Sequence, residues 1–231
     1  MHTDLARLCE PTEFLDHESP AVAAFVAAAL RDTEDTEAGG PGAVQRAVRL
    51  YYAVRDGLRY DVYGADLSRA GMRASTIVDR GAGFCIHKSL VYAAAVRAVG
   101  IPSRLVFADV RNHLASQRLR DLVGGDLFRF HSLTEVHLDG RWVRATPVFD
   151  RLLCRLYRMA PLEFDGSSDS LYHPYDEAGR RHMEFVHWHG SFDDFPYELV
   201  IGGIRDSHPR LFAGSVTTTD GSLLTEAVAT S

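Results

Sequence analysis

Lysine is almost absent from this sequence. Lys88 is the only one, and the other 24 basic residues are arginine. The 25 basic residues are outnumbered by 31 acidic ones, so the formal net charge is -6. A protein that binds nucleic acid needs a basic surface to neutralise phosphates. This charge balance therefore argues against a nucleic acid as the partner.

Cysteines are also few. Cys9, Cys85 and Cys154 are an odd number at wide spacing, which fits neither a disulfide framework nor a paired zinc motif. The apolar run at 21–30 is too short to span a bilayer. The first residues lack the basic stretch and apolar run of a signal peptide. We therefore expect a cytoplasmic protein without a membrane partner, whose cysteines act as thiols if they act at all.

The composition is that of a globular protein, with 46% hydrophobic and 24% charged residues among 231. This length is sufficient for a sizeable core. We predict a single domain over residues 1–214, with its core at about 45–150. The last residues, 215–231, are rich in Ser, Thr and Ala, and we expect them to form a flexible tail.

Hydrophobic periodicity predicts helices followed by strands. The expected helices cover 20–31, 43–58, 85–99 and 150–159, and the expected strands cover 104–110, 127–138, 141–147 and 183–188. Residues 32–44 are expected to be a loop, and 196–204 a mixed segment. The dipeptide Asp139-Gly140 is typical of a two-residue type I′ hairpin turn. Because helices precede strands in blocks, we predict an α+β fold with an antiparallel sheet.

Cys85 follows a glycine-bearing loop (GAGF, 81–84) and starts an apolar helix. Free backbone N–H groups and the helix dipole at such a position stabilise a thiolate, and the same N–H groups can hold an oxyanion. We therefore expect a lowered thiol pKa and a nucleophilic Cys85. Nothing around Cys9 or Cys154 distinguishes them from inert buried thiols. Lys88, one helical turn further on, would add positive potential, a secondary feature.

A nucleophilic cysteine needs a base, and His131 stands near the head of a predicted strand. With the turn at 139–140, Leu133 lies opposite Thr146, so Thr146 is the diagonal neighbour of His131 on one face. A residue that orients the imidazole is therefore expected at or near position 146. The spacing alone does not distinguish a catalytic His131 from a buried structural histidine.

Two segments resemble the core of the transglutaminase-like superfamily: residues 81–110 (GAGFCIHKSLVYAAAVRAVGIPSRLVFADV) and 130–150 (FHSLTEVHLDGRWVRATPVFD). They share a Gly-x-Cys helix start, a Gly-Ile-Pro-x-Arg strand entry, a His-led strand, a tight turn and a Trp-led strand. The resemblance covers about residues 45–150. It implies a papain-like α+β fold with a Cys-His-Asp triad, in which Cys85 matches the nucleophile and His131 the base.

The third position departs from the family pattern, because Thr146 stands where the family carries its aspartate. A hydroxyl can accept a hydrogen bond from the imidazole but cannot stabilise an imidazolium as a carboxylate does. The candidates to orient the histidine are Thr146 itself, Asp150, Asp109 and Asn112. We favour a carboxylate, Asp150 or Asp109, without choosing between them. A degenerate, non-catalytic site is the remaining alternative.

One histidine-rich segment contains four side chains of metal-binding type. In an extended strand, His182 and Glu184 share one face while His187 and His189 share the other, so the four do not converge. We therefore predict no metal site. The sequence also lacks a Gly-rich phosphate loop and a dinucleotide motif, and we expect no cofactor.

The expected function is that of a cysteine acyltransferase or hydrolase, such as an amidase, that acts on an amide or a carrier-protein thioester. Cys85 attacks an acyl carbonyl, His131 takes its proton, the Cys85 backbone N–H supplies one oxyanion donor, and water, an amine or a carbon nucleophile resolves the thioester. The resemblance permits amide formation, peptide or isopeptide hydrolysis, and action on carrier-protein thioesters in bacterial natural-product pathways, including Dieckmann-type ring closure. A short chain favours a small-molecule or carrier-bound acyl substrate. The alternatives are a cysteine peptidase and a non-catalytic binding module. The oligomeric state stays open.

Overall fold

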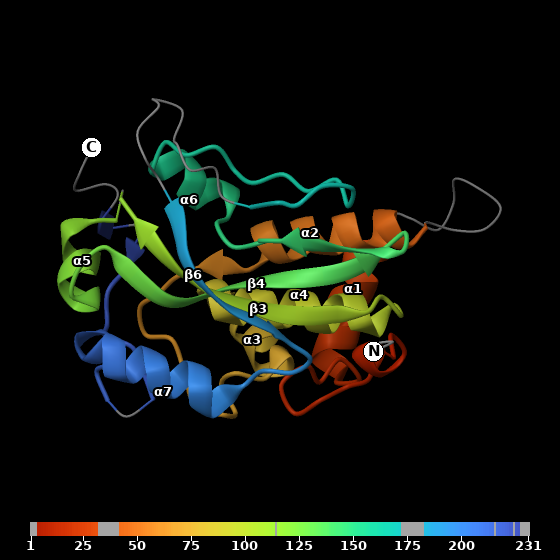
Figure 1. Ribbon diagram of the computed structural model, residues 1–231, viewed down its shortest axis with the longest axis horizontal. Helices are drawn as coiled ribbons and strands as arrows, with labels where there is room; N and C mark the ends of the chain where they lie inside the picture. Colours follow the sequence, from red (N-terminus) through yellow and green to blue (C-terminus); the bar gives the residue numbers. More distant parts are fainter. Residues whose placement is uncertain are drawn as a thin grey trace.

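The computed structural model describes residues 4–31, 42–113, 115–171, 183–214, 216–223 and 225–226. In this part of the chain, four helices stack against one face of an antiparallel sheet, which confirms the predicted α+β class (Figure 1). Shorter helices and the C-terminal segment gather at one end of the sheet.

The helical layer is formed by the first half of the chain. It consists of α1 (Pro20–Leu30), α2 (Ala43–Gly57), α3 (Ala74–Arg80) and α4 (Cys85–Ala98). The first of these begins at Ser19, whose side chain accepts the backbone N–H of Val22 and so caps a free donor. Three of the four match predicted helices, whereas α3 was not predicted.

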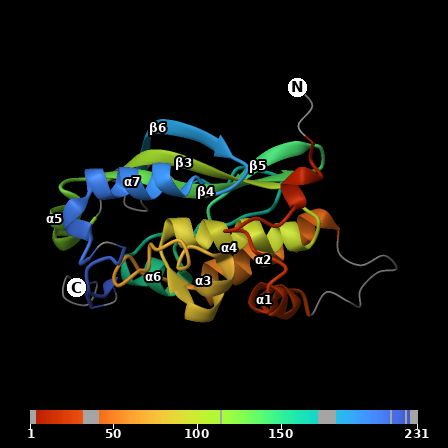
Figure 2. The same ribbon diagram turned by 90° about the horizontal axis from the view of Figure 1, so that it is seen from below.

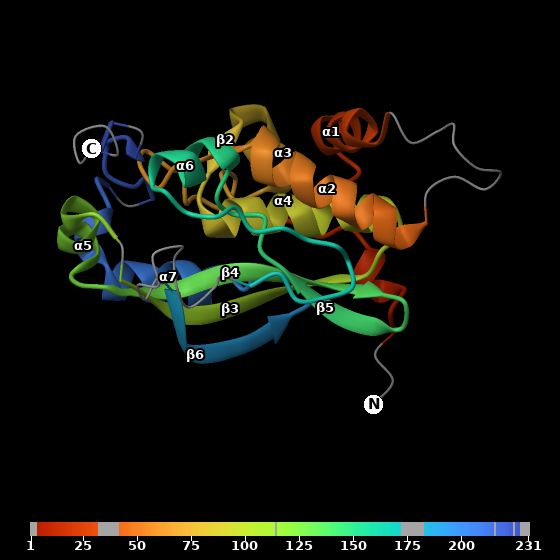
Figure 3. The ribbon, with the colours of Figure 1, turned by 90° about the horizontal axis from the view of Figure 1, so that it is seen from above.

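The helix α4 is the centre of the molecule. Every residue from Cys85 to Arg97 is buried, because the sheet lies on one side of α4 and the other helices lie on the other side (Figure 3). The chain leaves this helix through Gly100, whose φ of 74° suits a residue without Cβ. A helix buried all round is a rigid support for the residue at its N-terminus.

The sheet has the order β5-β4-β3-β6, and all its pairings are antiparallel. Its strands are β3 (Ser103–Asn112), β4 (Leu127–Leu138), β5 (Arg141–Ala145) and β6 (Met183–Phe192). Positive φ angles at Asp139 and Gly140, 48° and 80°, confirm the predicted hairpin turn. A two-residue parallel pair, β1 (Arg59–Tyr60) with β2 (Ala82–Gly83), fixes the loop before α4.

Three further helices lie at one end of the molecule, where the C-terminal segment also lies (Figure 2). They are α5 (Gln117–Val123), α6 (Arg151–Leu156) and α7 (Tyr197–Ser207). The sequence predicted α6 only. The mixed character expected for 196–204 is wrong, because these residues lie almost entirely in α7. In the described part of the chain, 3-10 turns occupy Arg7–Cys9 and Pro209–Leu211.

The described part of the C-terminal segment packs onto the domain. Thr218 is fully buried, its hydroxyl donates to the Val62 carbonyl, and it forms a bridge with Phe212. The predicted domain boundary at 214 stays a prediction, although Thr218 beyond it is hydrogen-bonded to the Val62 carbonyl. The predicted loop at 32–44 lies mostly outside the described residues. Within the described ranges, no helix combines the length and apolar character needed to cross a membrane.

Candidate active site

Cys85 is the first residue of α4, and its position is set by the β1–β2 pair two residues earlier. Tyr60 pairs with Gly83 in that parallel ladder. Cys85 lines a cavity and is 8% exposed. The backbone N–H groups of Ser132 and Ile86 lie against it and favour the thiolate. The sequence therefore placed the thiol correctly at a helix N-terminus.

The expected low thiol pKa is not found. Burial raises the pKa of Cys85 to about 11, which outweighs the stabilisation of the thiolate by the neighbouring N–H groups. Cys154, which is also buried, has its pKa raised to about 11 by the same cause. The two thiols differ in their accessibility to a substrate, because Cys85 lines the cavity.

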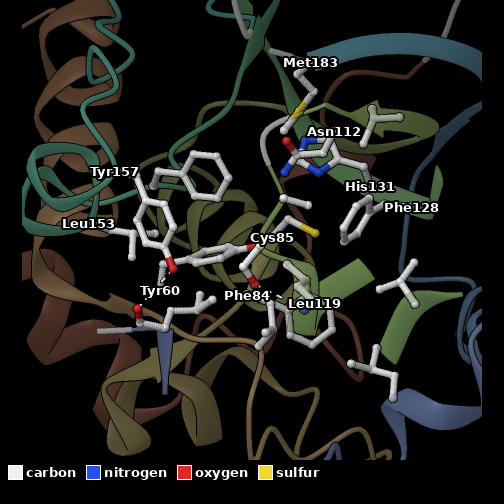
Figure 4. A pocket seen from close by; sticks show the side chains of 18 of the residues that line it. Tyr60, Phe84, Cys85, Asn112, Leu119, Phe128, His131, Leu153, Tyr157 and Met183 are labelled. Carbon is white, nitrogen blue, oxygen red and sulfur yellow. Dashed lines mark hydrogen bonds between the residues drawn. The ribbon is translucent and has the colours of Figure 1, made fainter. Parts of the chain in front are cut away.

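His131 lies on β4, next to the residue whose N–H contacts the Cys85 sulfur. It pairs with Ala108 of β3 and is 6% exposed. Burial lowers the pKa of His131 to about 4. Figure 4 shows the imidazole and the sulfur on the same side of the cavity. The resting site therefore holds a neutral imidazole beside a neutral thiol.

A backbone irregularity lies immediately before His131. Phe130 has a φ of 56°, in the left-handed region that favours glycine, and the β3–β4 register shifts between Ala108 and Val110. The Asp109 carboxylate accepts the Phe130 N–H at 3.2 Å. A β-bulge re-aims side chains on its strand, and here it precedes the histidine that faces the thiol.

Two of the four candidate orienting residues are engaged elsewhere through their polar atoms. The Thr146 hydroxyl donates to the Ser170 carbonyl at 2.8 Å. Both Asp150 oxygens accept backbone N–H groups, from Tyr60 at 2.9 Å and Leu153 at 2.8 Å, so Asp150 caps α6 and anchors β1. These contacts give both residues a structural role.

The other two candidates lie on opposite faces of β3. Asp109 is fully buried and binds Arg129 and His189 as well as the Phe130 N–H. Strand alternation puts Asn112 on the same face as Val110, and both line the cavity together with the histidine. In Figure 4, Asn112 and His131 are drawn at the same end of the cavity. The preference for a carboxylate is therefore not supported for Asp109, whose face of the strand turns away.

The cavity in front of Cys85 has a volume of about 450 Å³. Segments that are distant in the sequence form its walls. The hydrophobic pattern of the sequence does not predict that these segments meet. The contributions that sequence analysis missed come from α5, from the end of α7 and from the C-terminal segment: Leu119, Val123, Ile204, Leu211 and Leu223.

Lys88 serves structure rather than the thiol. It is fully buried, and its Nζ donates to the carbonyls of Arg55 and Leu58 at 2.8 and 2.7 Å. These carbonyls lie at the C-terminal end of α2, where helix carbonyls lack intrahelical partners. Burial lowers the pKa of Lys88 to about 7. The lone lysine thus joins two helices of the core.

The histidine-rich segment forms part of β6, and its first member, His182, lies outside the described residues. His189 Nε2 is 2.7 Å from Asp109 Oδ1, and Glu184 lies 3.4 Å from His113 Nε2. Among the described residues, no group of three or more His, Cys, Asp or Glu side chains is arranged to hold a metal.

The family model of the transglutaminase-like superfamily matches residues 27–147, which include both Cys85 and His131. The chain belongs to this superfamily. The match covers more than half of the chain and supports a cysteine-based enzyme in general. No curated protein sequence matches the chain.

Two solved structures are similar to part of this chain. One is a candidate cysteine protease of Cytophaga hutchinsonii, 15% identical, with a TM-score of 0.44 over 84% of this chain and 58% of that one. The other is a candidate protease of Parabacteroides distasonis, also 15% identical, with a TM-score of 0.37 over 63% of this chain and 27% of that one. This chain thus spans less than two thirds of either protein.

Proposed function

We propose that the protein is an acyl-transfer enzyme in which Cys85 forms a thioester with its substrate. The observation that carries the proposal is the meeting of α4 and β4 at the cavity. Cys85, the first residue of α4, lines the cavity with its side chain. The backbone N–H of Ser132 on β4 contacts its sulfur, and His131, the residue before Ser132, lines the same cavity. A nucleophile and a base on rigid elements, facing one cavity, are the parts that this chemistry needs.

The reaction begins from the neutral pair. The imidazole of His131 removes the thiol proton as Cys85 Sγ bonds to the acyl carbon, and the imidazolium then returns that proton to the leaving group. The backbone N–H of Cys85 supplies one donor to the oxyanion. In the second half, an acceptor loses its proton to His131 and attacks the thioester, the bond between the acyl carbon and Cys85 Sγ breaks, and the imidazolium returns the proton to the sulfur. Each half is balanced in protons and needs no metal or cofactor.

Asn112 is the residue we propose to orient the imidazole. It lies on the cavity face of β3, and its amide oxygen can accept a hydrogen bond from an imidazole N–H. A neutral amide suits a site whose burial keeps the histidine neutral. The orienting group would thus come from the strand on one side of β4, whereas the family's aspartate position, Thr146, lies just beyond β5 on the other side.

The acyl donor is proposed to be a small-molecule or carrier-protein thioester of bacterial natural-product metabolism. The acceptor is water, an amine or a carbon nucleophile within the same substrate. The alternatives are a cysteine peptidase and a binding module without catalysis. Asn112 beside the histidine favours the enzyme over the binding module, since it restores the group missing at Thr146.

The test measures acylation of the protein by p-nitrophenyl acetate with intact-mass detection. We expect one acyl group per chain, mapped to Cys85 and absent from a Cys85→Ala variant. A Cys154→Ser variant is the matched control and should react like wild type, because that thiol does not line the cavity. His131→Ala should slow acylation about 100-fold. Equal, slow labelling of all three cysteines would contradict the proposal.

A further inference from the structure

The wall composition of the cavity narrows the substrate class. Its volume of about 450 Å³ lies in the range that small-molecule ligands occupy. Sixteen of its 25 lining residues have aliphatic, methionine or phenylalanine side chains. Polar substituents of an acyl group would lose hydration against these apolar side chains.

The aromatic side of the cavity is held in place by its own contacts. Tyr60 and Phe149 meet edge to face with their ring centroids 4.7 Å apart. The Tyr157 hydroxyl donates to the Leu223 carbonyl at 3.1 Å, which ties the C-terminal segment to α6. The wall is therefore formed before any substrate arrives, which reduces the ordering cost of binding.

The charges of the described lining residues have one sign. They include Arg129 and Arg158 but no aspartate or glutamate. Glu226 lies close by, but its carboxylate accepts from the hydroxyls of Tyr63 and Ser116. Arg129 is itself paired with buried Asp109, and Arg158 is exposed to solvent, so neither arginine offers a buried counter-charge to an anionic acyl group. A cationic acyl group would find no counter-charge among these residues.

We infer that Cys85 accepts an uncharged, bulky apolar acyl group, an aliphatic chain or an aryl group, that fills this cavity. The inference rests on the proposed function, because the acyl carbon must reach the sulfur. In the transfer, the Cys85 S–C bond forms and the donor's C–S bond breaks. The proton of Cys85 leaves with the donor as its free thiol.

The experiment compares N-acetylcysteamine thioesters of acetyl, butanoyl, octanoyl and succinyl groups. Acylation of Cys85 in the wild type, followed by intact mass, should quicken from acetyl to octanoyl. Each methylene is expected to raise the rate about fourfold, the ratio that burial of one methylene supplies, until the cavity is filled. Succinyl, of the same chain length as butanoyl, should react at least 10-fold more slowly than butanoyl. Equal rates, or faster succinylation, would overturn the inference.

Variants of a cavity residue test whether the cavity causes the preference for a long acyl chain. Leu119→Trp, and the milder Leu119→Phe, should lower octanoyl acylation at least 10-fold more than acetyl acylation, since each fills space that the longer chain needs. Leu152→Trp is the control, because Leu152 is 44% exposed and does not line the cavity. An unchanged octanoyl preference in both folded Leu119 variants would count against the cavity as its source.

A binding measurement separates the two proposals. Cys85→Ala protein is titrated calorimetrically with octanoyl-N-acetylcysteamine and with its succinyl counterpart. Selective binding of the octanoyl compound, without acylation of the wild type by any thioester, would support the apolar cavity and overturn the proposed chemistry. Acylation of the wild type without a preference for chain length would support the proposed chemistry and overturn the inference of an apolar acyl group.

Discussion

The Asp109 carboxylate accepts the backbone N–H of Phe130, the residue immediately before His131, at 3.2 Å. The two residues lie at the bulge that interrupts the β3–β4 register. Three contacts stabilise Phe130 in its left-handed backbone conformation. It has this hydrogen bond, its ring stacks on His189 at 4.3 Å, and it packs against Gly203, where a Cβ would approach the ring to 2.2 Å. We therefore expect Asp109 to be a positioning residue that acts on the histidine through the backbone.

Replacing Asp109 by alanine should impair both stability and chemistry. The Phe130 N–H and the Arg129 and His189 side chains lose a buried acceptor, which should cost about 1–3 kcal/mol in urea unfolding. Release of the strained bulge should slow Cys85 acylation. Asp109→Asn keeps an acceptor for the Phe130 N–H and should recover most of the rate. Asp193→Ala, at a more exposed acid paired with Arg104, is the control. An Asp109→Ala protein with wild-type kinetics would remove the positioning role.

Removing the Asn112 amide should act on the histidine rather than on stability. We expect Asn112→Ala to slow acylation roughly 10- to 100-fold, because general-base catalysis depends on the ring orientation. Asn112→Asp places a carboxylate there and should raise the pKa of His131, since a nearby negative charge favours the imidazolium. The pKa can be followed by NMR titration of the ring protons. If neither variant changes the rate or the titration, Asn112 does not orient the histidine.

The alkylation rate of Cys85 should follow thiol ionisation. The pKa of Cys85 is raised to about 11 and that of His131 is lowered to about 4, both by burial. Without substrate, both groups are thus neutral near pH 7. The iodoacetamide rate should therefore rise about 10-fold per pH unit from pH 7 to 10. A rate plateau between pH 5 and 8 would instead indicate a preformed thiolate–imidazolium pair and contradict this prediction.

The sequence predicts those features of this structure that depend on residues close together in the chain. The Asp139-Gly140 turn fixed the register of β4 with β5, and the GAGF loop located Cys85 at its helix start, because each feature lies within a few residues. Asn112 was one of four open candidates, since its place beside the histidine follows from the order of strands in the sheet. The cavity walls at Leu119 and Leu223 meet only through tertiary packing. The raised thiol pKa has the same origin, because burial is a property of the whole fold.

Lys88 stabilises the helical core, whereas the sequence-based expectation was an electrostatic contribution to the thiol. Lys88→Met keeps the apolar stem but leaves the Arg55 and Leu58 carbonyls without their buried donor. Unfolding free energy should fall by about 2–4 kcal/mol near pH 7. Acylation of Cys85 by the protein that remains folded should be near wild type, because the ammonium is engaged at the end of α2.

The pH dependence gives this lysine a signature of its own. Burial lowers its pKa to about 7 in the folded protein, from about 10.4 in an unfolded chain. Between these values the unfolded chain binds more protons, so the contribution of Lys88 to stability rises with pH across that window. The difference in unfolding free energy between wild type and Lys88→Met should therefore grow from pH 7 to 10. Taking the difference cancels the titration of the cysteines and tyrosines, which both proteins share. A constant difference would show that the buried ammonium keeps its proton, held by the two carbonyls.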